Sequence, residues 1–141
     1  MTDDNYNLNR FLEAQQSVYQ QALNEIKNGR KRSHWMWFIF PQIGGLGFSE
    51  ISKLYSIKDL KEAKLYVDHD VLGSRLIEIS KTLLKIKGKT ANQIFGTPDD
   101  MKLKSCMTLF SSLENANTVF EAVLIKYFNG EKDNKTLQII E

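Results

Sequence analysis

The 141-residue sequence contains one cysteine and two histidines, so it is poor in the side chains that form disulfides and bind transition metals. A single cysteine, Cys106, excludes an internal disulfide and a zinc site built on several thiolates. The histidines, His34 and His69, belong to neither an H-x-x-x-H nor an E-x-x-H spacing. We therefore predict no metal site and no cofactor.

Long hydrophobic runs and targeting segments are also missing. The longest apolar run, from Trp35 to Phe40, has six residues, whereas a membrane-spanning helix needs about 20. The first residues are acidic and polar and lack the apolar core of a secretory signal. Together with the lone cysteine, these absences predict a cytoplasmic protein without a membrane partner.

Neither sign of charge dominates, because 19 Lys and Arg residues stand against 17 Asp and Glu residues, for a net charge of +2. This balance gives no support to nucleic acid as a partner. Basic residues gather once, at Lys27, Arg30, Lys31 and Arg32, directly after a helical pattern. That position favours an interaction with the helix dipole over a contact with phosphate.

Apolar residues recur at helical spacing along most of the chain. Between Leu8 and Ile26 they keep to one face for five turns, and Gly29 follows where a left-handed residue ends a helix. Residues suited to N-caps, Ser49, Asp59 and Thr90 among them, precede several later patterns. Further helices are predicted over residues 50–55, 60–67, 72–86, 91–95, 98–110, 119–128 and 134–140, with Thr97 as the cap and Pro98 as the first residue of the fifth.

No repeat or linker divides the chain, so residues 1–141 are predicted to form a single all-α domain, with residues 1–6 frayed at its start. Because the helices are uneven in length and their connections short, an irregular or orthogonal bundle of about seven to eight helices without significant sheet fits better than a regular four-helix bundle.

One stretch combines the rare residue types: Ser33-His34-Trp35-Met36-Trp37-Phe38-Ile39-Phe40-Pro41-Gln42, followed by Ile43-Gly44-Gly45-Leu46-Gly47. Six consecutive apolar residues show no period, so helix and buried strand are both compatible with them. No other segment offers a strand partner, and we therefore predict a short buried helix that Ser33 caps and Pro41 stops.

This stretch, with several others, resembles a bacterial family of domains of unknown function that is often labelled calpastatin, although nothing in the chain resembles the repeats of a protease inhibitor. Asp70 and Cys106 depart from the family pattern, which has proline and serine there. The resemblance implies an irregular all-α fold and implies no activity. It rests on Ala14-Gln15, Tyr19, residues 29–42, Gly45-Leu46-Gly47, Leu72-Gly73-x-Arg75-Leu76, Ile94-Phe95-Gly96-x-Pro98-Asp99, Lys102-Leu103-Lys104-Ser105 and Met107-Thr108-Leu109-Phe110.

A polar frame around the aromatic run predicts a ligand site. Apolar walls with a few converging polar groups are typical of small-molecule pockets, and a lysine, an arginine or a glycine turn suits an anionic group. We therefore expect a small-ligand-binding domain or an enzyme acting on a nucleotide-like or phosphorylated metabolite. Catalysis, as a hydrolysis, is assigned to His34 and Asp99, and ligand contacts to Trp35, Trp37, Gln42, Gly45, Gly47, Arg75 and Lys102.

Two alternatives stay open. The chain can be a non-catalytic module that binds protein or nucleic acid through an aromatic and basic patch, or the aromatic run can be core alone. His69, between two aspartates, is interpreted as a helix cap rather than a general base. Arg75 is expected to be partly buried and to pair with an internal aspartate such as Asp99. Cys106, on an apolar face, is expected to be a buried and inert thiol.

Overall fold

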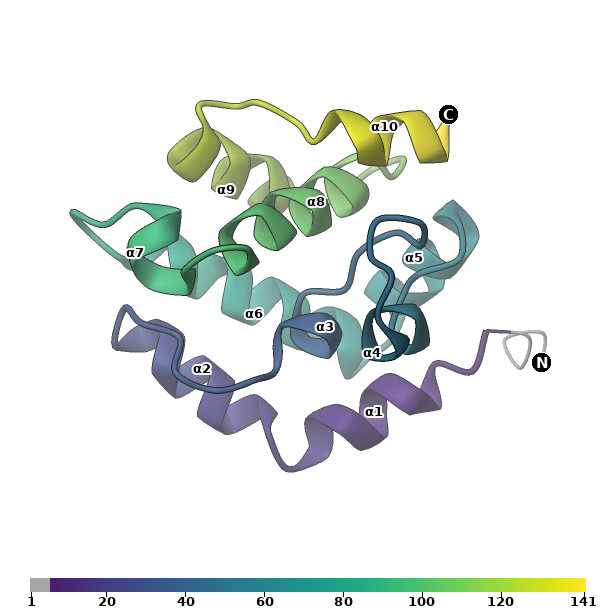
Figure 1. Cartoon of the computed structure of the whole chain (residues 1–141), viewed down its shortest axis with the longest axis horizontal. Helices are drawn as coiled ribbons and strands as arrows, with labels where there is room; N and C mark the ends of the chain where they lie inside the picture. Colours follow the sequence, from purple (N-terminus) through teal and green to yellow (C-terminus); the bar gives the residue numbers. More distant parts are fainter. Residues whose placement is uncertain (1–5) are drawn as a thin grey trace.

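The structure is a computed structural model that describes residues 6–141, and in that part of the chain it contains ten helices and no strand (Figure 1). A single parallel bridge joins Ile43 and Ile57. The all-helical class is confirmed, but the predicted count of seven to eight helices is too low. The helices are α1 (Asn9–Gln16), α2 (Tyr19–Lys27), α3 (Met36–Ile39), α4 (Glu50–Leu54), α5 (Leu60–Asp68), α6 (Leu72–Lys85), α7 (Ala91–Phe95), α8 (Asp99–Ser111), α9 (Thr118–Phe128) and α10 (Asn134–Ile140).

The first predicted helix is in fact two helices. The chain turns at Ser17 and Val18, where the N–H of Val18 donates to the carbonyl of Gln15 and α1 ends. Serine and β-branched valine are both weak helix formers, so the long apolar face does not hold the backbone in one helix. As a result α1 packs on α3 and α2 packs on α6. The frayed start predicted for residues 1–6 lies outside the described residues except for Tyr6, whose hydroxyl lies 3.1 Å from Asp59 Oδ2.

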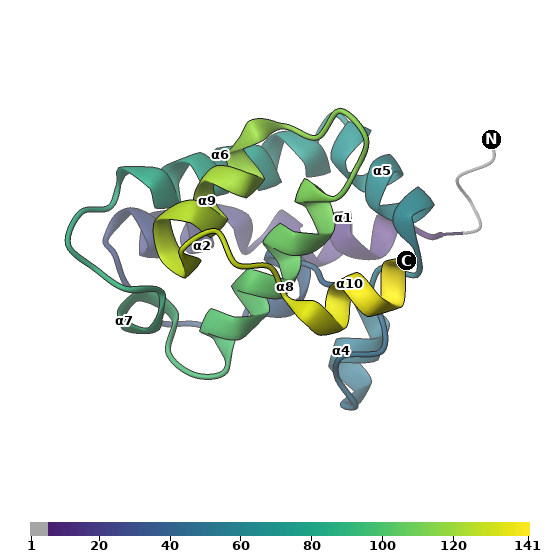
Figure 2. The same cartoon turned by 90° about the horizontal axis from the view of Figure 1, so that it is seen from above.

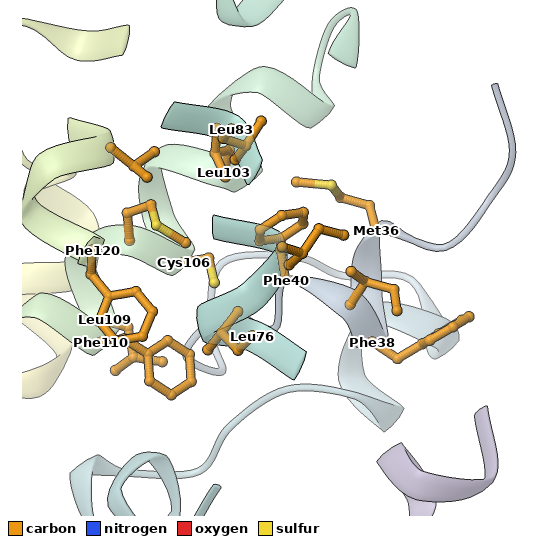
Figure 3. Close-up of a cluster of buried hydrophobic side chains, with 14 of the residues drawn as sticks. Met36, Phe38, Phe40, Leu76, Leu83, Leu103, Cys106, Leu109, Phe110 and Phe120 are labelled. Atoms are coloured by element: carbon orange, nitrogen blue, oxygen red, sulfur yellow. The ribbon is translucent and has the colours of Figure 1, made fainter. Parts of the chain in front are cut away.

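The core forms where α9 packs against both α6 and α8, while α2 packs on α6 and α5 packs on α6 and α8 (Figure 2). Side chains from the segment 36–40 extend this core toward α1 (Figure 3). Each fully buried large apolar side chain contributes about 1.5–3 kcal/mol to folding. Burial raises the pKa of the Cys106 thiol well above its usual value, in agreement with the inert thiol expected from the sequence.

Most predicted helix starts are confirmed. The side chains of Ser49, Asp59 and Thr90 accept backbone N–H groups at the starts of α4, α5 and α7. The start of α8 is different, because the helix begins at Asp99 and the hydroxyl of Thr97 instead accepts a hydrogen bond of 2.8 Å from Asn92 Nδ2.

The aromatic run forms the short helix α3, which ends before Phe40 and Pro41 as predicted. Its predicted cap is wrong, since α3 begins only after Trp35 and has no side-chain cap. The Ser33 hydroxyl donates instead to Oε2 of Glu25, at 2.6 Å. None of the helices in residues 6–141 has the length and apolar character needed to cross a bilayer.

Candidate functional site

A cleft of about 290 Å³ opens beside α3, where residues 42–47 and α4 face the first turns of α8 and α10. The helices α4, α8 and α10 are labelled in Figures 1 and 2. The cleft joins segments that are far apart in the sequence. Its lining is formed by Trp37, Gln42, Ile43, Gly44, Gly45, Leu46, Gly47, Ser52, Lys53, Tyr55, Ser56, Pro98, Met101, Lys102, Ser105, Asp133 and Lys135.

One wall of the cleft combines an aromatic ring with a cation. Trp37 is partly exposed, whereas Met36 and Phe38 on either side of it are buried. Lys102 reaches from α8 and places its Nζ 5.1 Å from the centroid of the Trp37 ring. At this distance the ammonium group is attracted by the electron-rich face of the indole. The pair presents a flat apolar surface and a positive charge side by side.

Asp99 forms an ion pair with this lysine. Its Oδ1 lies 3.4 Å from Lys102 Nζ, and its Oδ2 lies 2.9 Å from the Nζ of Lys31, whose side chain is almost fully buried. Each carboxylate oxygen thus faces a lysine. Asp99 therefore acts in this structure as an ion-pair partner that orients Lys102.

The glycine segment forms the opposite rim. The Gly44 N–H donates to the Ile57 carbonyl and the Ile57 N–H donates to the Gln42 carbonyl, each at 2.8 Å. Gly45 has a φ of +100°, which favours glycine, and a Cβ placed on Gly47 would lie only 2.7 Å from Ser52 Oγ. A side chain at Gly47 would therefore require the Ser52 side chain to move.

The floor of the cleft is polar where α8 meets α10. Ser105 Oγ and the N–H of Thr136 both donate to Oδ2 of Asp133, at 3.1 Å. The N–H of Asp133 in turn donates to the hydroxyl of Thr108. These bonds make Asp133 the cap of α10, and they fix a carboxylate at the cleft.

Among the predicted site residues, the structure brings Trp37, Gln42, Gly45, Gly47 and Lys102 together in the cleft lining. The remaining predicted site residues, which do not line the cleft, are His34, Trp35, Arg75 and Asp99.

Trp35 is fully buried, and its indole Nε1 donates a hydrogen bond of 2.9 Å to Oε1 of Glu25. His34 is exposed and does not belong to the residues that line the cleft. The aromatic run is therefore mostly core, as one alternative held, with Trp37 as its one partly exposed ring.

Arg75 does not pair with Asp99. Its Nη1 donates to Oε1 of Gln15 at 3.3 Å, and its guanidinium carbon lies 5.2 Å from the centroid of the Tyr19 ring. His69 is the predicted cap, since its Nδ1 accepts the N–H groups of Val71 and Leu72 at the start of α6. Arg75 thus links α6 to α1, and His69 caps the start of α6.

Glu25 is an important residue that the sequence reasoning missed. Burial alone would raise its pKa, but hydrogen bonds from the Ser33 hydroxyl, the Arg32 N–H, the Trp35 indole and Gln21 outweigh burial and lower the pKa to about 2. One signal was available. Glu25 stands three residues after the buried Ala22 and next to the buried Ile26, on the apolar side of α2.

Tyr55, Ser105 and Asp133 were also missed as cleft residues, because their convergence depends on tertiary packing and no local pattern encodes it. Within residues 6–141 no three His, Cys, Asp or Glu side chains are close enough together to hold a metal ion. The polar groups at the cleft are instead lysines, an amide, hydroxyls and one aspartate, which suit hydrogen bonding and anion binding.

A solved structure of another protein has the same fold as this chain. The chain is similar to the crystal structure of the conserved hypothetical protein Rv1873 from Mycobacterium tuberculosis, with 45% identity, a TM-score of 0.94 and 96% of each chain covered. A search of curated proteins gave no match. The family described as "Protein of unknown function (DUF1810)" matches residues 5–140. Since this match spans nearly the whole sequence, the chain belongs to the DUF1810 family.

Proposed function

We propose that the cleft binds a small metabolite in which a planar ring is joined to a phosphate, as in a nucleotide. The observation that carries this proposal is the pairing of Trp37 with Lys102 in the cleft wall. An indole supplies a surface on which a planar ring stacks, and an ammonium group supplies a charge for an anion. A ligand with both features uses both side chains at once.

The charges around the cleft support an anionic ligand. Lys53, Lys102 and Lys135 line it, against the single carboxylate of Asp133. The N–H groups of residues 45–47 form no hydrogen bond within the described part of the chain, and these residues line the cleft together with the three lysines. Successive free N–H groups in a glycine-containing turn are suited to phosphate oxygens.

The size of the cleft limits the ligand. Its volume of about 290 Å³ lies at the lower end of the range for small-molecule sites. A mononucleotide or a smaller phosphate ester fits this volume better than a dinucleotide. The proposal includes the cytoplasm as the place of action, which agrees with the single cysteine of the sequence.

The proposed function is binding, and it does not include hydrolysis by His34 and Asp99. His34 does not belong to the cleft lining, and both carboxylate oxygens of Asp99 face lysines. A general base must reach the proton that it removes, and Asp99 is oriented toward Lys31 and Lys102 instead.

Isothermal titration calorimetry with the full chain tests the proposal. The probes are AMP, adenosine, which lacks the phosphate, and ribose 5-phosphate, which lacks the ring. We expect AMP to bind more tightly than either half. Absence of heat with all three probes, or equal affinity for AMP and adenosine, would overturn the proposal.

Two variants separate the contributions. Lys102→Met is expected to weaken AMP about tenfold or more and to leave adenosine unchanged, because it removes only the charge. Trp37→Leu is expected to weaken AMP and adenosine alike. Lys81→Met, on an exposed lysine of α6 that does not line the cleft, is the matched control and should bind all three probes as the wild type does.

A further inference from the structure

We propose that a second, basic hollow at the other end of the molecule binds the phosphate backbone of a nucleic acid. The hollow has a volume of about 570 Å³ and lies between the end of α2 and the segment that joins α6 to α7. Both segments lie at the same end of the molecule in Figures 1 and 2. Lys27, Lys85, Lys87 and Lys89 line it.

The two segments contain basic residues and no acidic ones, although the whole chain is nearly neutral. Residues 26–34 contain Lys27, Arg30, Lys31 and Arg32, and residues 79–98 contain four lysines, with no Asp or Glu in either segment. The sequence shows these as separate clusters. The fold brings them together, since Lys89 Nζ donates a hydrogen bond of 3.0 Å to the Gly29 carbonyl.

Within the described residues, no ion pair neutralises the lysines of the hollow. The ion pairs found among residues 6–141 involve Arg10, Lys31, Lys64, Lys102 and Lys104. None of them uses Lys27, Lys85 or Lys87, which are all exposed. Like charges that line one hollow repel one another, and a polyanion removes that repulsion as it binds.

The chemistry of the hollow favours nucleic acid over other polyanions. An anionic membrane is normally engaged by basic residues together with exposed apolar ones, and the exposed large apolar side chains of this protein, such as Phe48 and Leu54, do not line the hollow. All four cations that line the hollow are lysines, and each ammonium group binds a phosphate oxygen as a point charge. Lysines spaced along a groove suit successive phosphates, read without regard to sequence.

Fluorescence anisotropy with a short labelled single-stranded RNA of mixed sequence tests the proposal. Four phosphate contacts predict a slope of log K against log salt near −3, which is a loss of about 50-fold between 50 and 200 mM salt. The double variant Lys85→Glu/Lys87→Glu should bind at least tenfold more weakly at 50 mM salt. Lys27→Gln/Lys87→Gln, which only removes charge, should lower the slope by about 1.4.

A matched control carries the same change of charge elsewhere. Lys61 and Lys132 are exposed and lie outside the hollow. The variant Lys61→Glu/Lys132→Glu should therefore lose much less RNA affinity than Lys85→Glu/Lys87→Glu. The proposal is overturned if the wild type does not bind RNA at 50 mM salt, if the control loses as much affinity as Lys85→Glu/Lys87→Glu, or if polyglutamate or phosphatidylserine vesicles bind more tightly than RNA. Unchanged calorimetry with AMP in the hollow variants shows that the first cleft is intact, so the two proposals fail or succeed separately.

Discussion

The indole Nε1 of Trp35 donates a hydrogen bond of 2.9 Å to Oε1 of Glu25, a carboxylate that is 8% exposed. The same carboxylate accepts the N–H groups of Arg32 and Ser33 and the Ser33 hydroxyl. One side chain of α2 therefore anchors residues 32–35, which lead into α3. This segment fixes where α3 begins, and with it the position of Trp37 in the cleft.

Stability is expected to depend on the charge of Glu25 in acid. Its pKa is near 2 in the folded protein and near 4.5 without the fold, so the folded state favours the charged form. This contribution is fully present above pH 4.5 and is lost as the pH falls toward 2. Glu25→Gln should destabilise the protein by about 2 kcal/mol at pH 7, because a buried set of donors loses its charged acceptor.

Urea unfolding at a series of pH values measures this effect. The difference between wild type and Glu25→Gln should shrink as the pH falls from 4.5 to 2. Glu13→Gln, on an exposed residue of α1, serves as the control and should stay close to the wild type throughout. A difference that stays constant with pH would contradict the assigned role.

Arg10 and Glu62 are expected to be coupled strongly. Arg10 Nη2 lies 3.0 Å from Oε2 of the fully buried Glu62, and the guanidinium also donates to the carbonyls of Leu54 and Ser56. Arg10→Met leaves a buried charge without its partner and should cost about 3–5 kcal/mol. The double variant Arg10→Met/Glu62→Gln should recover part of this loss, which a double-mutant cycle measured by urea unfolding will show. Additive losses would argue against coupling.

Gly73 is expected to tolerate no side chain. A Cβ at this position would lie 1.9 Å from the carbonyl oxygen of Val67, where α6 passes over the last turn of α5. Gly73→Ala must push the two helices apart and should destabilise the protein by about 3 kcal/mol or more. The exposed neighbour offers a control, since Ser74→Ala should change the free energy of unfolding by less than about 1 kcal/mol. Equal stability of the two variants would show that the close packing of α5 on α6 is not maintained in solution.

Neutralising Asp99 is expected to strengthen AMP binding in the proposed cleft. Asp99 attracts Lys102 at 3.4 Å, and removing its charge leaves the lysine free for phosphate. Asp99→Asn should raise the affinity for AMP about two- to fivefold, the size of a partly exposed ion pair. Asp100→Asn, one residue away and outside the ion pair, is the calorimetric control. Weaker binding to Asp99→Asn would contradict this prediction and show that the ion pair is needed to hold Lys102 in place for the ligand.

The secondary structure follows from local rules in most places. The apolar period from Leu72 to Ile86 defines α6 to within one residue, and the side-chain caps at Ser49, Asp59 and Thr90 are local enough to be found from sequence alone. The break at Ser17 cannot be found in this way, because the apolar face continues through it. Only the tertiary packing shows that two helices are needed there.

The site could be predicted only in part. Trp37, Gln42 and Lys102 line the cleft as expected, but six consecutive apolar residues carry no period, and nothing local distinguishes Trp35, which is buried, from Trp37, which is not. Asp133 comes into position through Ser105 and Thr108, which are distant in the chain, and spacing does not reveal such contacts. The partners of Glu25 are nearer in the chain, but most of them lie in the irregular segment between α2 and α3, where no period predicts the fold.

The contrast between the two indoles gives the protein two separate optical reporters. Trp35, enclosed in the core, should emit at short wavelength and resist quenching by acrylamide until the chain unfolds. Trp37, partly open to solvent beside Lys102, should emit further to the red and lose accessibility when a ligand stacks on it. Since the chain contains only these two tryptophans, its intrinsic fluorescence follows unfolding through one ring and occupancy of the cleft through the other, without any added label.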